Sequence, residues 1–298
     1  MELAIEIENL CKVYPGRMAL DNVSFSVKKG SIHGFLGPNG AGKSTTMKIL
    51  SGLIPETSGK FIVNGKVGFL PEHPPVYPNM TVKDYLNFVF SIYAYTGSSN
   101  HIVEVMKKTG LTDVQNRLIG NLSKGYQQRV GIAQAIVHSP EIIILDEPTV
   151  GLDPVAIADI RALINELKND HTILFSSHQL HDVELLCSEI TLINQGKIVV
   201  SGAIDTILSD LKTNMSVKAR VMNFSEEAKK KLQSTFAVET VTFEQDRENK
   251  NTILRIATKG KNDIRPELAR FLSDSSIGLL EFYEERSDLE DLFKRIHE

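Results

Sequence analysis

Residues 31–50 read SIHGFLGPNGAGKSTTMKIL, and this stretch decides the fold. An apolar segment of strand length, 31–36, runs directly into a glycine-rich loop, and a helical segment follows. From Gly37 to Ser44 the loop fits the pattern G-x-x-x-x-G-K-[ST]. Its glycines let successive backbone N–H groups point at one phosphate, and the helix that follows directs its positive end to the same place. The stretch therefore predicts a loop that binds the phosphates of a nucleotide.

Two side chains at the end of this loop are predicted to act on the phosphates. Lys43 would reach the β- and γ-phosphates, and the Ser44 hydroxyl would bind Mg²⁺. The alternative, a glycine turn that fits the pattern by chance, is disfavoured by the flanking strand and helix. The nucleotide-binding residues predicted here are Gly37, Pro38, Asn39, Gly40, Ala41, Gly42, Lys43, Ser44 and Thr45.

A second element of a phosphate site is found at residues 142–147, which read IIILDE. The apolar run predicts a buried strand, which would hold Asp146 beside the loop, where a carboxylate can bind Mg²⁺ through water. Glu147, one residue further along, would polarise the attacking water as a catalytic residue. An acidic pair after a strand more often only ends that strand, but the phosphate loop upstream favours the functional interpretation.

Composition limits the kind of protein this can be. The chain has 298 residues and a formal net charge of −4, which argues against a nucleic-acid binder that relies on bulk positive charge, so no nucleic acid is expected as a partner. The two cysteines, Cys11 and Cys187, have no metal-like spacing, which favours a reducing compartment. No stretch approaches the roughly 20 apolar residues of a membrane helix, and the first residues do not resemble a signal peptide. A role at a membrane would therefore need a partner.

The order of elements predicts two domains. Strands alternate with helices over residues 1–207, which predicts an α/β fold with a parallel core, an antiparallel β subdomain and a helical insertion over about 73–140. A further helix of this part is predicted over 159–167. Residues 208–298 predict a small α+β accessory domain, for which a ferredoxin-like arrangement is the candidate, with a last helix over 289–296.

Residues 122–130 read LSKGYQQRV and narrow the class of nucleotide-binding protein. The segment resembles the signature segment of ABC ATPases, usually written LSGGQ: Ser123 and Gly125 match, whereas Lys124 and Tyr126 depart from it. The hydroxyl, the small residue and a helix N-terminus that can face a phosphate are all retained. In that family the segment contacts the γ-phosphate held by the other subunit, so the resemblance implies a homodimer with two ATP molecules between the subunits. For this segment in isolation, an ordinary capped helix is the alternative.

Three further residues extend the resemblance along the chain. Asp153, in the run VGLDP, matches the family's D-loop at the subunit interface. His178, which follows a predicted strand, matches the switch histidine and would contact the γ-phosphate and hold Glu147 and its water in line. Tyr14 matches the aromatic residue that stacks on adenine, with an ordinary tyrosine at the end of a strand as the alternative.

One position departs from the family's pattern in a way that affects the metal. The Q-loop normally carries a glutamine, and here Glu72 stands at the matching position. A carboxylate can still bind Mg²⁺, so Glu72 joins Ser44 and Asp146 as a predicted metal ligand. The substitution adds negative charge near the phosphates, and related exporter-type ATPases carry the same variant.

The resemblance covers roughly residues 3–207 and implies a P-loop ABC ATPase with ATP and Mg²⁺ as cofactors. It implies a separate integral membrane permease as partner, and a cytoplasmic location on the inner face of the membrane through that permease. The last part of the chain more loosely resembles the extension on ATPases of drug, polysaccharide and gliding-type export systems, which favours export.

Two other classes of ABC protein are the alternatives. One acts in translation or DNA maintenance, but its members usually carry two cassettes in one chain or a long coiled-coil insertion, and neither pattern is present here. The other binds ATP for regulation without turnover, and the presence of both Glu147 and His178 argues against it. The transported substrate is not specified by this sequence.

Overall fold

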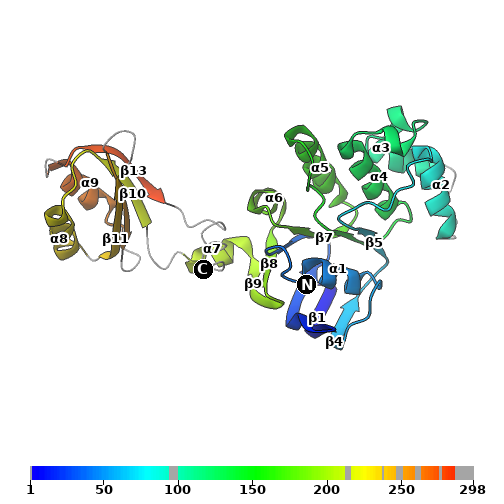
Figure 1. Cartoon of the computed structure of the whole chain (residues 1–298), viewed down its shortest axis with the longest axis horizontal. Helices are drawn as coiled ribbons and strands as arrows, with labels where there is room; N and C mark the ends of the chain where they lie inside the picture. Colours follow the sequence, from blue (N-terminus) through cyan, green and yellow to red (C-terminus); the bar gives the residue numbers. More distant parts are fainter. Residues whose placement is uncertain are drawn as a thin grey trace. The chain divides into compact units, whose positions relative to one another are not determined.

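The computed structural model describes residues 2–93, 100–211, 216–236, 238–245, 251–258, 263–274 and 277–285. The chain divides into two compact units, Met1–Ile204 and Asp205–Glu298 (Figure 1). Each unit has its own cluster of buried apolar side chains.

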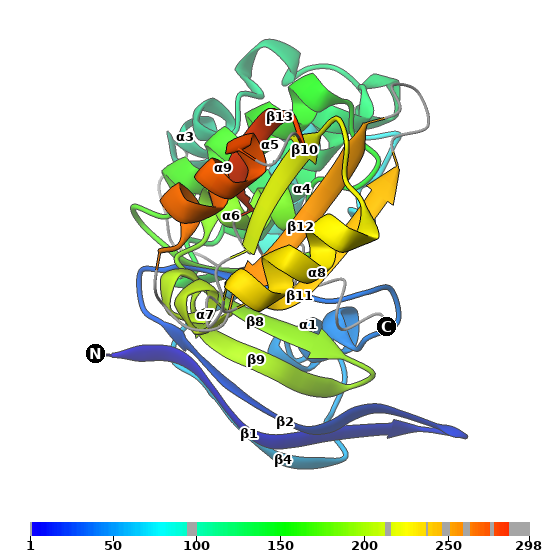
Figure 2. The ribbon, with the colours of Figure 1, turned by 90° about the vertical axis from the view of Figure 1, so that its left-hand side faces the viewer.

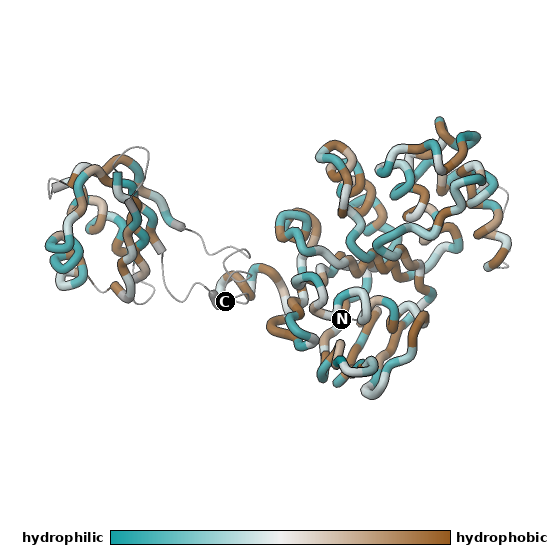
Figure 3. The backbone as a smooth tube through the Cα atoms, in the orientation of Figure 1, coloured by the Kyte–Doolittle hydropathy of each residue, from teal (hydrophilic) through white to brown (hydrophobic). Residues whose placement is uncertain are grey.

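A six-stranded sheet forms the centre of the first unit, and its strands in spatial order are β5 (Val67–Leu70), β6 (Ile142–Leu145), β7 (Thr172–Ser177), β3 (Ile32–Leu36), β8 (Glu189–Asn194) and β9 (Lys197–Ala203). All neighbours pair in parallel except β9, which is antiparallel to β8. The strands β6, β7 and β3 are buried at every residue, which explains their nearly continuous apolar sequence. Figure 3 shows the hydrophobic colour gathered along this central layer.

The carboxyl ends of three neighbouring strands position the site. β3 ends at Leu36 before the glycine-rich loop, β6 ends before Asp146, and β7 ends before His178. Because parallel strands end at the same edge of a sheet, these three connections come together. The helices that follow them are α1 (Lys43–Leu50), α5 (Pro154–Leu167) and α6 (Leu180–Leu186).

The helix expected over 159–167 begins five residues earlier, at Pro154. Asp153 caps it, since one carboxylate oxygen accepts from the backbone N–H groups of Val155 and Ala156 at 3.1 and 2.9 Å. A proline in the first turn costs the helix no hydrogen bond there, so the cap and the proline together fix the start of α5.

A second, antiparallel sheet packs against α1 and has the order β2 (Arg17–Lys28), β1 (Leu3–Tyr14) and β4 (Ser58–Val63). Side chains such as Val23 of this sheet, Met47 of α1 and Ile144 of the large sheet share one buried cluster. Figure 2 shows the three strands as a separate layer of the first unit. The predicted α/β fold with a parallel core and an antiparallel β subdomain is therefore confirmed.

Between β5 and β6 the chain forms the helical insertion, with α2 (Val82–Ile92), α3 (Asn100–Lys108) and α4 (Lys124–Ile136). Two short 3₁₀ turns, Thr112–Val114 and Ile119–Asn121, connect α3 to α4. Among the residues that the structure describes, no helix is both long and apolar enough to cross a bilayer.

The second unit begins at Asp205, within α7 (Ile204–Leu211). It continues with β10 (Ser216–Val221), α8 (Glu226–Thr235), β11 (Val238–Gln245), β12 (Thr252–Thr258), α9 (Arg265–Asp274) and β13 (Leu279–Glu285). The four strands form an antiparallel sheet in the order β11-β12-β10-β13. Figure 2 shows α8 and α9 on the same face of this sheet. From β10 onward the element order is β-α-β-β-α-β, that of the ferredoxin-like arrangement. The helix predicted over 289–296 lies outside the described residues.

Candidate functional site

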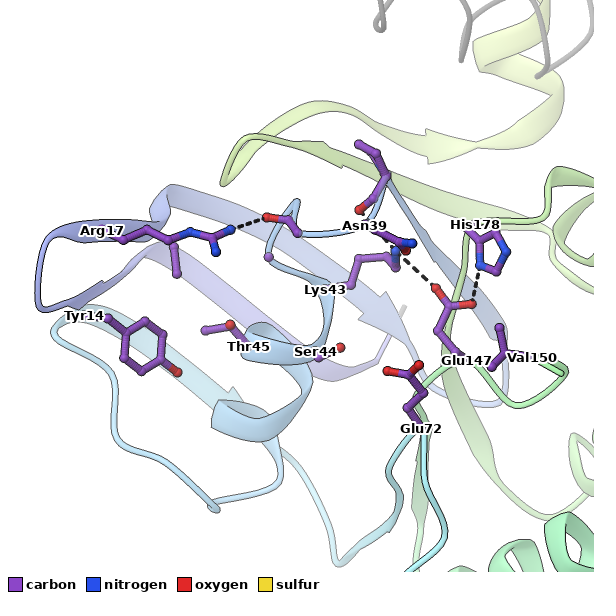
Figure 4. Close-up of a pocket in the computed structure, with 14 residues that line it drawn as sticks. Tyr14, Arg17, Asn39, Lys43, Ser44, Thr45, Glu72, Glu147, Val150 and His178 are labelled. Atoms are coloured by element: carbon purple, nitrogen blue, oxygen red, sulfur yellow. Dashed lines mark hydrogen bonds and ion pairs between the residues drawn. The ribbon is translucent and has the colours of Figure 1, made fainter.

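A pocket of about 370 Å³ lies at the carboxyl edge of the large sheet, and it gathers most of the residues singled out in the sequence (Figure 4). It is lined by Tyr14, Arg17, Ala19, Pro38, Asn39, Gly40, Gly42, Lys43, Ser44, Thr45, Glu72, Glu147, Val150 and His178. Gly37 and Ala41 belong to the same loop without lining the pocket. Segments that are more than 160 residues apart in the chain, from Tyr14 to His178, therefore meet around one space.

The glycine-rich loop takes backbone conformations that only glycine adopts easily. Gly40 and Gly42 have φ values of +80° and +117°. A Cβ atom at Gly42 would lie 2.9 Å from the backbone oxygen of Ala19, so the loop approaches the antiparallel sheet too closely for a larger residue. The motif glycines are therefore needed for the shape of the loop, and they also let its backbone N–H groups approach a phosphate.

Lys43 and Glu147 form an ion pair inside the pocket. Lys43 Nζ lies 3.1 Å from Glu147 Oε1, and both side chains are almost completely buried. Lys43 Nζ also donates to the backbone oxygen of Gly37 at 2.6 Å, which holds the ammonium over the loop. This arrangement places the ammonium group of Lys43, which lines the pocket, beside the catalytic candidate Glu147.

His178 contacts the same carboxylate from the other side. Its Nδ1 lies 2.8 Å from Glu147 Oε2, and Figure 4 shows Glu147 between Lys43 and His178. The backbone of Glu147 has φ +51°, in the left-handed region that non-glycine residues rarely adopt. Such a conformation persists where the surrounding contacts enforce it, and it is common at functional sites.

Asp146 is not among the residues that line the pocket. Its side chain is buried, and its Oδ1 accepts from the hydroxyl of Ser176 at 2.7 Å. The same Ser176 oxygen accepts from the backbone N–H of Glu147 at 2.9 Å. In this geometry Asp146 fixes the start of the Glu147 segment through Ser176, and its role as a metal ligand stays a prediction.

The residues expected to bind Mg²⁺ present a suitable set of oxygen donors. Ser44 and Glu72 both line the pocket, and Figure 4 shows the Glu72 carboxylate beside the Ser44 end of the loop. Mg²⁺ is usually held by one or two carboxylates together with substrate phosphates and water. A hydroxyl and a carboxylate next to a phosphate loop fit that pattern, so these residues would hold Mg²⁺ together with ATP.

Tyr14 and three unpredicted residues complete the wall of the pocket. Tyr14 is at the end of β1, and the strand register pairs it with Arg17 at the start of β2. Arg17 Nη2 donates to the backbone oxygen of Gly40 at 2.8 Å, so its guanidinium lies against the phosphate loop. Ala19 and Val150 were also missed. The tight Pro15–Gly16 turn, which brings positions 14 and 17 together, was the signal that could have revealed Arg17.

The signature residues do not line the pocket. Ser123 caps α4, with its hydroxyl oxygen 3.5 Å from the backbone nitrogen of Tyr126. A Cβ atom at Gly125 would lie 3.0 Å from the Cβ of Ala156, so α4 begins close to the first turn of α5. Asp153 caps that helix. The structure therefore brings Ser123, Gly125 and Asp153 near one another through α4 and α5, on a part of the fold outside the pocket wall.

Comparison with known proteins agrees with this geometry. Residues 20–150 match the family model described as "ABC transporter". The chain is 40% identical over 211 residues to the lantibiotic transport ATP-binding protein SrtF of Streptococcus pyogenes, covering 67% of this chain and 91% of that protein. It is 38% identical over 213 residues to the bacitracin transport ATP-binding protein BcrA of Bacillus licheniformis, covering 67% of this chain and 69% of that protein.

Solved structures of ATP-binding cassettes have the same fold. A structure described as the ATP-binding subunit of an ABC transporter gives a TM-score of 0.63 at 27% identity, over 70% of this chain and 93% of that one. The dimeric structure of MJ0796, a bacterial ABC transporter cassette, gives a TM-score of 0.61 at 26% identity, over 67% of this chain and 98% of that one. With the phosphate loop, the acidic strand end and the histidine around one pocket, the chain belongs to the ABC transporter ATP-binding proteins and is an ATPase coupled to transport.

Proposed function

We propose that this chain hydrolyses MgATP in a homodimer and thereby energises a separate membrane permease, in the direction of export. The observation that carries the proposal is the line of contacts from Lys43 through Glu147 to His178, at 3.1 and 2.8 Å. These three residues follow three different strands of one sheet, and each is of the type that phosphoryl transfer to water requires: a cation, a base and a hydrogen-bonding partner for that base.

In this proposal the chain's own groups bind the phosphates and orient the water. Lys43 and the backbone amides of the loop would bind the β- and γ-phosphates, and Mg²⁺ would neutralise charge on them. Within the described part of the chain, Glu147 Oε1 accepts no hydrogen bond, although it is paired electrostatically with Lys43. In the proposal this buried oxygen would accept from a water molecule once Lys43 has moved onto the phosphates, while His178 would fix the other oxygen of the same carboxylate.

The homodimer is proposed from the residues that stay outside the pocket. Ser123 and Gly125 begin a helix whose N-terminal N–H groups suit an anion, yet they do not line the pocket of their own chain. A second copy could present this helix end to the γ-phosphate. The dimeric structure of MJ0796 shows that a cassette of this fold can dimerise.

The permease is proposed to bind an exposed apolar patch beside the Glu72 segment. Three side chains before and within α2 form this patch: Tyr77, Phe88 and Ile92 are 51, 41 and 63% exposed, and Phe88 and Ile92 are four residues apart on one face of the helix. The rings of Tyr77 and Phe88 lie 5.7 Å apart, so these two members are in contact. Because Tyr77 is five residues after Glu72, movement at the pocket could reach the patch over a short length of chain.

Export is proposed from the relatives' names. SrtF and BcrA are named for lantibiotic and bacitracin transport, and a third relative, LnrL of Bacillus subtilis, 34% identical over 237 residues, is named for linearmycin resistance. All three names concern antimicrobial compounds, and export of such a compound from the cell is one way to provide resistance. We therefore propose an antimicrobial or similar amphipathic cargo, selected by the permease.

Co-purification from membranes tests the partner. The full chain is expected to bring down an integral membrane protein, and Phe88→Asp is expected to lose it while still binding ATP, because a charge in an apolar contact is costly. Val199→Asp, at an exposed valine of β9, is the matched control and should keep the partner. Recovery of ribosomes or nucleic acid in place of a membrane protein would contradict the proposal.

A further inference from the structure

Asp182 is a buried carboxylate that the proposed chemistry does not use. It lies in α6, four residues after His178, and its side chain is 0% exposed. It does not line the pocket. A carboxylate taken this far from water needs hydrogen bonds and a counter-charge, and losing either of them is costly.

Two side chains satisfy this carboxylate. The hydroxyl of Thr149 donates to Asp182 Oδ2 at 2.6 Å. Arg161 donates from Nε to Oδ1 at 2.8 Å, and its Nη2 forms an ion pair with the same oxygen. Thr149 is itself buried, so its hydroxyl donates to Asp182 at a place that water does not reach.

Each member of this cluster belongs to a segment that carries a site residue. Thr149 is two residues after Glu147 and directly before Val150, which lines the pocket. Arg161 is in α5, the helix that Asp153 caps. Asp182 is in α6, the helix after His178. The cluster therefore ties the segment between β6 and α5, which carries Glu147, to α6, which follows the segment that carries His178.

We propose that Asp182, through Thr149, is a positioning residue for the contact between Glu147 and His178. The Glu147 backbone is strained, at φ +51°, and Ser176 holds its N–H from one side. The bond from Thr149 to Asp182 holds the next turn of the same segment from the other side. Loss of this bond lets the Glu147 segment move relative to His178. A small displacement of a catalytic group lowers the rate of the chemical step considerably. This inference depends on the proposed roles of Glu147 and His178.

Thr149→Val tests it, because valine keeps the shape of threonine and removes only the hydroxyl. In the full-length chain the variant is expected to lower kcat for ATP by roughly tenfold and to leave the KM for ATP within about twofold, since the residue does not touch ATP. Thr149→Ser, which keeps a hydroxyl, is expected to retain most of the rate. Thr109→Val is the matched control: Thr109 directly follows α3 and is also buried, and its hydroxyl donates to the backbone oxygens of Val105 and Met106 in that helix at 2.8 and 3.4 Å.

A double-mutant cycle with His178→Ala separates positioning from general stability. A positioning role predicts that Thr149→Val lowers kcat far less in the His178→Ala background, because the contact that it supports is already lost. Asp182→Asn, as a second variant, should behave in the same way. Unchanged kcat in Thr149→Val, or effects that simply multiply with those of His178→Ala, would overturn the inference. No effect of His178→Ala alone would instead contradict the proposed role of His178.

Discussion

Two helix N-termini of this chain are candidates for binding the same phosphate, and they differ in their surroundings. α1 begins after Gly42, which has no side chain to cap it, and its first residues Lys43, Ser44 and Thr45 line the pocket. α4 begins after Ser123, whose hydroxyl caps it, and its first turn stays outside the pocket. The first helix end thus leaves its N–H groups to a ligand within its own chain, whereas the second is already partly satisfied.

This difference gives the two helix ends separate tasks. The loop before α1 has a cation, a carboxylate and a hydroxyl within one pocket, so it can bind MgATP in a single subunit. The end of α4 adds no side chain to that pocket, so we expect it to act only when a second copy brings it to the γ-phosphate. Variants at α1 should therefore change ATP binding, and variants at α4 should change turnover alone.

Lys43→Ala should have the largest effect of the variants considered. It removes the buried cation of the α1 loop and leaves Glu147 without its ion-pair partner, so that both ATP binding and turnover suffer. We expect kcat/KM for ATP to fall by about 1000-fold, measured by phosphate release from the full chain. Unchanged ATPase activity would contradict the assignment of this pocket as the phosphate-binding site. Lys48→Ala, in the last turn of the same helix, is the control and should be active.

Glu147→Gln should separate binding from turnover. The amide keeps the size of the side chain and can still bond to His178, but it cannot accept a proton from water, so kcat is expected to fall by roughly 100-fold. ATP should still bind, and the ATP-bound chain should persist as a dimer in light scattering. A variant that turns over at the normal rate as a monomer would contradict the proposed separation of tasks between α1 and α4.

Ser123→Ala tests the α4 helix end directly. Removal of the hydroxyl is expected to lower kcat by roughly tenfold in the dimer and to leave ATP binding to one subunit unchanged. It also removes a helix cap, which costs about 1 kcal/mol of stability, so the melting temperature should fall as well. Ser225→Ala removes the equivalent cap of α8 in the second unit and should lower stability without affecting turnover. A weaker ATP affinity in Ser123→Ala monomers would contradict the comparison.

The parts of the site that could be predicted from sequence are those set by short segments. The strand, glycine loop and helix around Lys43 are contiguous, and Glu147 directly follows an apolar strand, so local patterns suffice to place them. His178 and Tyr14 are isolated in the sequence, and only the family resemblance singled them out. The structure brings both to the pocket wall.

The parts that could not be predicted depend on which side chains meet across the fold. Thr149 and Asp182 are 33 residues apart, and no local pattern shows that the second carboxylate is buried against the first hydroxyl. Asp146 was predicted as a Mg²⁺ ligand from its place after the strand, but no local pattern shows that its carboxylate accepts from Ser176 of the neighbouring strand. Strand ends can be read from a sequence, whereas the direction of each side chain at the strand end is set by its neighbours in space.

Arg17→Ala should have the smallest effect, and it tests whether the affinity of the α1 pocket for ATP comes from its buried groups alone. The Arg17 guanidinium is on an exposed residue and bonds to the Gly40 carbonyl, so its attraction for phosphates is weakened by solvent. We expect the Kd for ATP to rise by roughly threefold in low salt, and the difference to shrink at high salt because added ions screen an exposed charge. Arg17→Lys should keep most of the affinity. A salt-independent loss in Arg17→Ala would mean that the guanidinium acts by holding the loop through Gly40, and an unchanged Kd would assign the whole affinity of the α1 pocket to its buried groups.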